Sequence, residues 1–111
     1  MARRLQADED VPSRYVCTFA QQAAEKALKA ALIAEQGDVL RTHDLVGLDD
    51  VLKTPIGVEV TELAALGDWG AKSRYPDNWT EPTHEKAARA LAIAEEVVVL
   101  VTRRLGIEER P

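Results

Sequence analysis

Polar side chains at helical spacing mark residues 21–30, which read Gln-Gln-Ala-Ala-Glu-Lys-Ala-Leu-Lys-Ala. Gln22, Glu25 and Lys29 are three and four positions apart, so they share one face of an α-helix. Charged helix faces are most often solvated, and Glu25 with Lys29 is then an ordinary surface pair. The other interpretation is a polar ledge that faces a ligand or a partner protein, and the sequence alone leaves both open.

A histidine follows this segment in the sequence Arg-Thr-His-Asp-Leu of residues 41–45. Polar residues at the start of a helix commonly hydrogen-bond nearby backbone, which is the structural interpretation of His43. An unperturbed imidazole also titrates near neutrality, as a general acid or base requires. His43 is therefore our candidate for a catalytic residue.

The third polar segment is Ser-Arg-Tyr-Pro-Asp at residues 73–77. An arginine at a helix C-terminus interacts favourably with the helix dipole. Arg74 also offers a planar fork of donors to a phosphate, with Tyr75 beside it to hydrogen-bond or stack. Trp69 and Trp79 flank this turn, either as stacking platforms or as lids on one end of the fold.

The sequence lacks the residues that a metal site or a cofactor site needs. The chain has two histidines and one cysteine, so a zinc site would need carboxylates that no spacing pattern identifies. Gly67, Gly70 and Lys72 are too closely spaced for a phosphate-binding loop. We therefore expect no metal and no cofactor. The single cysteine, the polar first ten residues and the lack of a long apolar run indicate a cytoplasmic protein outside the membrane.

Charge is unevenly distributed along the 111 residues, whose formal net charge is -5. Residues 38–70 hold seven acidic and two basic side chains, whereas residues 1–37 and 71–111 are each balanced. This acidity argues against a broad surface that coats nucleic acid. An anion-binding site is instead expected to draw on the two balanced segments.

Two long helices are predicted because glycine and proline are absent from residues 13–36 and 83–105. Ser13 and Thr83 are the expected N-caps, and Gly37 and Gly106 the expected C-terminal stops. Shorter helices are predicted between them. One has Thr42 as its expected cap and carries Leu45, Leu48 and Leu52. It ends before Pro55, because proline disfavours α geometry in its predecessor. The other runs from about residue 58 to about 73.

These elements predict one all-α domain over residues 1–111, an antiparallel up-and-down bundle of four main helices with a shortened N-terminal helix. In such a bundle His43 lies at one end, and the helix that precedes Arg74 finishes at the opposite end. The Ala-rich and Val-rich long helices then lack a full covering layer, which predicts a dimer.

Together the polar segments resemble the HEPN family, the higher eukaryotes and prokaryotes nucleotide-binding domain. The resemblance covers about residues 15–105, with its most specific part in residues 19–30, followed by residues 41–45, residues 73–77 and the alanine-rich closing helix. It implies an all-α bundle, usually a homodimer, that handles a nucleotide or RNA. It also implies a nucleotidyltransferase-type protein partner, with this chain as the toxin-like half of the pair.

Two departures from the family pattern leave enzymatic activity open. Ribonuclease members carry an arginine followed a few residues later by a histidine on the same helix. Here nine residues separate Arg74 from His84, and Pro76 and Pro82 lie between them, so that motif is not matched. Family members also usually open with a helix of several turns, whereas only residues 1–11 precede Pro12. The alternative function is a non-catalytic protein-interaction module.

Overall fold

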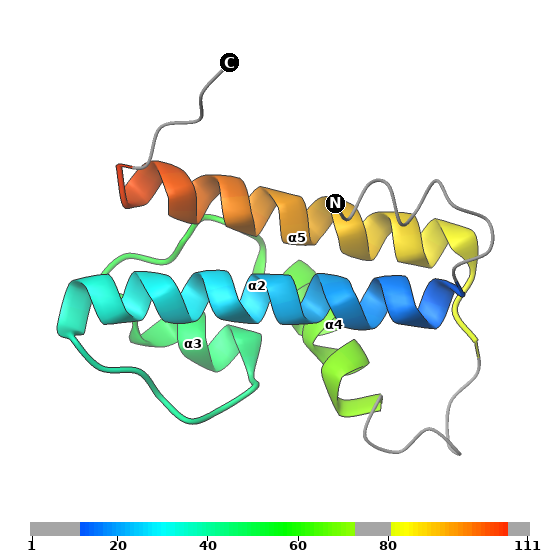
Figure 1. The fold of residues 1–111 in the computed structure, drawn as a ribbon, viewed down its shortest axis with the longest axis horizontal. Helices are drawn as coiled ribbons and strands as arrows, with labels where there is room; N and C mark the ends of the chain where they lie inside the picture. Colours follow the sequence, from blue (N-terminus) through cyan, green and yellow to red (C-terminus); the bar gives the residue numbers. More distant parts are fainter. Residues whose placement is uncertain (1–11, 73–80, 107–111) are drawn as a thin grey trace.

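The computed structural model describes residues 12–72 and 81–106. Four helices occupy most of this part of the chain (Figure 1): α2 (Ser13–Gln36), α3 (Leu45–Val51), α4 (Val60–Lys72) and α5 (His84–Arg104). No strand occurs in the two described ranges. The predicted all-α helical bundle is therefore confirmed, whereas the expected short N-terminal helix falls outside the described residues.

The ends of the long helices follow mostly from local chemistry. Gly37 adopts a left-handed conformation with φ 75°, and its N–H donates to the carbonyl of Ile33 over 2.8 Å. Thr83 caps α5, because its hydroxyl accepts from the backbone N–H of Lys86. The predicted cap at Ser13 is wrong by one position. Pro12 is the N-cap, with no side-chain cap bond, and Ser13 is the first buried residue of α2.

The helices do not alternate in direction as a simple up-and-down bundle would. Figure 1 shows α2 and α5 side by side and running the same way. The backbone N–H of Arg14, at the start of α2, donates to Glu81, just before α5, over 3.0 Å. The short α3 also follows the direction of α2, since its last residue, Val51, accepts from the side chain of Gln36.

This arrangement depends on residues 37–44, which double back along α2. Glu35 accepts from the backbone N–H of Lys53, so the chain returns to the end of α2 only after α3. Eight extended residues span up to about 26 Å, whereas the 11 positions from Glu25 to Gln36 rise only about 17 Å along a helix. The segment is therefore long enough to carry His43 back to the middle of α2, and His43 does not lie at the bundle end as expected.

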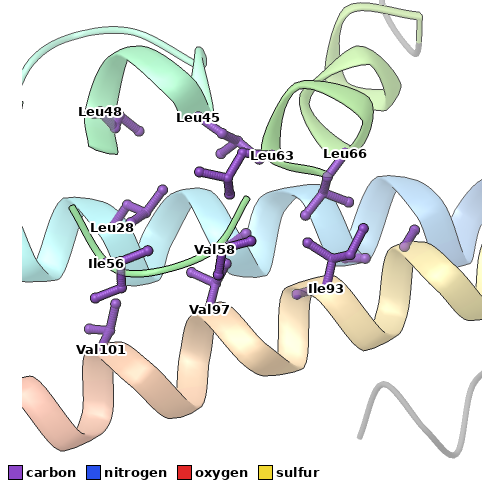
Figure 2. Packing of buried hydrophobic residues seen from close by; sticks show 14 of the residues in the cluster. Leu28, Leu45, Leu48, Ile56, Val58, Leu63, Leu66, Ile93, Val97 and Val101 are labelled. Atoms are coloured by element: carbon purple, nitrogen blue, oxygen red, sulfur yellow. The ribbon is translucent and has the colours of Figure 1, made fainter. Parts of the chain in front are cut away.

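Small residues let the two long helices approach closely. Three alanines of α2 and three of α5 are almost fully buried: Ala20, Ala24, Ala31, Ala87, Ala90 and Ala94. On the other side of this pair, leucines of α3 and α4 pack onto α2 (Figure 2). The Ile56 and Val58 side chains lie opposite Val101 and Val97 of α5. The core is thus aliphatic. Separately, none of the helices in the described residues is long and apolar enough to span a bilayer.

Polar contacts hold the segment between α3 and α4 in place. The buried carboxylate of Asp49 accepts from the backbone N–H of Ile56 over 2.7 Å. The guanidinium of Arg104 donates to the carbonyl of Pro55 over 2.9 Å. Because both contacts fix the chain just before α4, they set where α4 crosses the pair of long helices.

Two glycines have opposite expected effects on stability. At Gly67, inside α4, an added Cβ would lie 3.8 Å from Leu45 Cγ, an ordinary contact. We expect Gly67→Ala to raise the free energy of unfolding by about 0.5–1 kcal/mol. Gly37→Ala places a side chain at φ 75°, and we expect it to lower the free energy of unfolding by about 1–2 kcal/mol. Urea denaturation of both variants measures the two signs, and a change of the same sign in both would contradict these backbone assignments.

Candidate functional site

The carboxylate of Glu25 is the centre of a polar cluster in the middle of α2. Glu25 is 8% exposed and accepts hydrogen bonds from Gln21 Nε2 and Lys29 Nζ, each over 3.0 Å. These two partners lie one helical turn before and one turn after it. The third donor is His43 Nδ1, 18 positions along the chain and 3.0 Å from Glu25 Oε2.

These contacts keep Glu25 ionised. Burial is the largest single influence, and it acts to raise the pKa of the Glu25 carboxyl. The hydrogen bonds from Lys29, Gln21 and His43, together with the charge of Lys29, outweigh burial, so the pKa of Glu25 is lowered. A buried carboxylate with several donors is thus a fixed negative charge beneath His43.

The imidazole of His43 is oriented by this charge and open to solvent. Its side chain is 62% exposed, whereas that of Glu25 is 11% exposed. An ionised carboxylate only accepts hydrogen bonds, so Nδ1 carries the proton. In the neutral ring Nε2 is then the basic nitrogen. A histidine held in this way has the geometry of a general base, because a carboxylate fixes its tautomer and stabilises the charged ring.

A cleft of about 520 Å³ opens beside His43. Its walls are the segment that precedes α3 and one face of α4, and we call it the His43 cleft: Arg41, Thr42, His43, Asp44, Val46, Leu63, Ala64, Gly67 and Asp68. Arg41 and His43 supply donors, and Asp44 and Asp68 supply acceptors. Gly67 also lines the cleft, and a Cβ added there would make an ordinary contact with Leu45.

The structure brings together part of the candidate site. Lys29 and His43 both contact Glu25 directly. Gln22, however, is exposed on α2. The glutamine that hydrogen-bonds to Glu25 is instead Gln21. Gln21 also lies at a spacing of four from Glu25, so the sequence contained this signal. Arg74 and Tyr75 lie outside the described residues.

Arg41 and Asp68 line the cleft although sequence reasoning did not single them out. They were missed because the cleft joins segments that are far apart along the chain. Trp69 is half-buried and packs against the core, while Trp79 lies outside the described residues. Within the described ranges, no group of three or more His, Cys, Asp or Glu side chains is placed to hold a metal ion.

The lowered pKa of Glu25 predicts a specific pH dependence. Its stabilising contribution is complete above the ordinary pKa of glutamate, about 4.3, and is lost as the pH falls through the lowered pKa of the folded protein. We expect Glu25→Gln to lower the free energy of unfolding by about 1–3 kcal/mol near neutral pH. This difference from the unaltered protein should shrink below about pH 4.3.

Denaturant unfolding of both proteins across the acid range measures this effect. Glu96 is exposed on α5, so Glu96→Gln is the matched control and should change stability by less than about 0.5 kcal/mol. A Glu25→Gln difference that persists unchanged at acid pH would count against the ionised cluster.

Comparisons with known proteins identify the family. Comparison with curated proteins and comparison with solved structures gave no match. Among models of protein families, the HEPN domain matches residues 2–105. The match covers nearly the whole chain and includes the Glu25 cluster and the His43 cleft. The HEPN domain is in general a nucleotide- or RNA-binding module. The chain belongs to the HEPN domain family.

Proposed function

We propose that this chain is a homodimeric module that binds RNA or a nucleotide in the His43 cleft. The observation that carries the proposal is the exposed imidazole of His43, which the buried carboxylate of Glu25 orients at the edge of a 520 Å³ cleft. A purely structural histidine would need no open cleft beside it. Membership of the HEPN family supports the nucleotide or RNA as the class of ligand.

The polar groups of the cleft suit the parts of a nucleotide. The guanidinium of Arg41 can donate two parallel hydrogen bonds to a phosphate, and Asp44 and Asp68 can accept from ribose hydroxyls or base amines. Arg74 follows the last residue of α4 by two positions and is the second proposed phosphate contact, with Tyr75 beside it. Gln22 and Lys29 are the residues of α2 that we propose to contact the ligand.

RNA cleavage is the finer part of the proposal. His43 Nε2 would accept the proton of a ribose 2′-hydroxyl, whose oxygen attacks the adjacent phosphorus. The bond to the 5′-oxygen breaks, and that oxygen takes a proton from water. Glu25 stabilises the charged imidazole, and the arginines stabilise the charge on the phosphate. In this role the chain is the toxin-like half of a pair with a nucleotidyltransferase protein.

One observation favours the non-catalytic alternative. The bond from His43 to Glu25 also ties residues 37–44 to the middle of α2, so the same contact can serve only to shape the fold. The chain is then a protein-interaction module. Binding and cleavage experiments separate the two functions, because only the first requires RNA to bind in the cleft.

Binding should depend on the two arginines. We expect Arg74→Ala to weaken the binding of a short RNA more than any other basic substitution, with Arg41→Ala next. Arg74→Lys should be nearly as harmful as Arg74→Ala, because a lysine cannot reproduce two parallel hydrogen bonds. Fluorescence anisotropy measures the affinities. Arg103 is exposed on α5 and is the control, and an equal loss from Arg103→Ala would show that the site lies elsewhere.

Any RNA cleavage should depend on His43 and not on His84. We expect His43→Gln to reduce the cleavage rate at least about 100-fold, the lower range for a general base, while His84→Gln leaves it unchanged. His84 is the exposed first residue of α5, far along the chain from Glu25. Gel analysis of labelled RNA measures the rates, and cleavage that survives His43→Gln would refute the catalytic role.

The protein should be a dimer in solution. Large apolar side chains on the outer faces of α2 and α5 remain 38–56% exposed: Tyr15, Phe19, Ile33, Val98 and Val99. Exposed apolar patches commonly mark interfaces. Light scattering should give twice the chain mass of 12.2 kDa, and a mass near 12.2 kDa at micromolar concentration would contradict the prediction.

A further inference from the structure

The two acidic side chains of α4 have different surroundings. Glu62 pairs with the guanidinium of Arg89. Asp68 lies further along the same helix, is exposed and lines the His43 cleft. Within the described ranges, no hydrogen bond or ion pair engages the Asp68 carboxylate. Both of its oxygens are therefore available to a ligand in the cleft.

The other carboxylate of the cleft, that of Asp44, is placed differently. Asp44 is the N-cap of α3. Its Oδ2 lies over the first turn of that helix, 2.9 Å from the position of a Cβ added at Gly47. A carboxylate at a helix N-terminus interacts favourably with the helix dipole. Asp44 therefore already has a role in the fold, whereas the described contacts give the Asp68 carboxylate none.

The charges that line the His43 cleft restrict what it can bind. The guanidinium of Arg41 is accompanied by the carboxylates of Asp44 and Asp68. An ionised carboxylate repels phosphate, and it only accepts hydrogen bonds. Asp68 therefore strengthens binding only where the ligand presents N–H or O–H donors to it. In RNA these donors are the ribose hydroxyls, which every nucleotide has, and groups on the base edge, which differ between nucleotides.

Guanine is the base that matches both oxygens of a carboxylate. Its Watson–Crick edge carries two adjacent donors, the ring N1–H and the N2 amine, which can donate two parallel hydrogen bonds. Adenine and cytosine present one amine beside an acceptor nitrogen, and uracil presents one N–H between two carbonyl oxygens. Each of these three bases therefore places an acceptor against the carboxylate. The apolar side chains of Val46, Leu63 and Ala64 line the same cleft and complement the face of a base.

We propose that Asp68 gives the His43 cleft a preference for guanine in single-stranded RNA. The Asp68 carboxylate accepts from N1–H and from the N2 amine of the base, while Arg41 binds a phosphate of the same strand. An unpaired base exposes its Watson–Crick edge, which base pairing covers in a duplex. This inference rests on the proposed function, to which it adds the identity of one base and the residue that selects it.

The test uses a labelled short oligouridylate and versions of it in which one central uridine is replaced by guanosine, adenosine, cytidine or inosine. We expect the guanosine version to bind about tenfold more tightly than the uridine, adenosine and cytidine versions, because a bidentate contact distinguishes bases to about this extent. Inosine keeps N1–H but lacks the N2 amine, so its version should bind with intermediate affinity. Fluorescence anisotropy measures the dissociation constants.

Asp68→Asn replaces one acceptor oxygen by a donor amide at nearly constant size. It should reduce the affinity for the guanosine version about tenfold and should not weaken the binding of the uridine, adenosine and cytidine versions. Asp50 is exposed on α3 and does not line the cleft, so Asp50→Asn is the matched control and should keep the preference for guanosine. Circular dichroism checks that both variants are folded, and the inosine comparison tests the proposal on the unaltered protein.

The outcomes distinguish this inference from the proposed function. If the unaltered protein binds all the RNAs equally, or if Asp68→Asn keeps the preference for guanosine, the inference fails and the His43 cleft stands as the proposed binding site. If Asp68→Asn weakens all the RNAs to the same extent, Asp68 contacts the ribose and not a base, which also overturns the inference. If the unaltered protein binds none of the RNAs, the proposed function fails, and this inference fails with it.

Discussion

The arrangement of α2 and α3 depends on the buried carboxylate of Glu25. A buried carboxylate is unstable unless donors surround it, and the helix itself supplies two of them from Gln21 and Lys29. The third donor comes from outside the helix, and His43 provides it. The electrostatic requirement of one side chain in α2 thereby sets where a distant segment of the chain must return.

The path of that segment has consequences for the whole fold. Because residues 37–44 run back along α2, α3 follows the direction of α2, and the chain reaches α4 in the middle of the molecule (Figure 1). Asp49 and Arg104 hold the connection from α3 to α4. As a result one face of α4 forms a wall of the His43 cleft.

In the proposed function, an acidic protein binds RNA through defined contacts rather than through a basic surface. The formal net charge of -5 disfavours long-range attraction of phosphates. The His43 cleft combines Arg41 with the carboxylates of Asp44 and Asp68, a mixture that favours a ligand with donors as well as negative charge. A nucleotide has both in its base, sugar and phosphate, whereas an inorganic anion does not.

The sequence determined the features that depend on residues close along the chain. The absence of glycine and proline set the two long helices, Thr83 and Gly37 set two of their ends, and helix geometry alone put Lys29 beside Glu25. Tertiary structure decided the rest. The choice of Gln21 over Gln22 depended on which side of α2 is covered, and the contact of His43 with Glu25 depended on the route of residues 37–44. A helix fixes neighbours three and four positions apart, but the course of a loop is set by long-range packing and by the need of a buried charge for a donor.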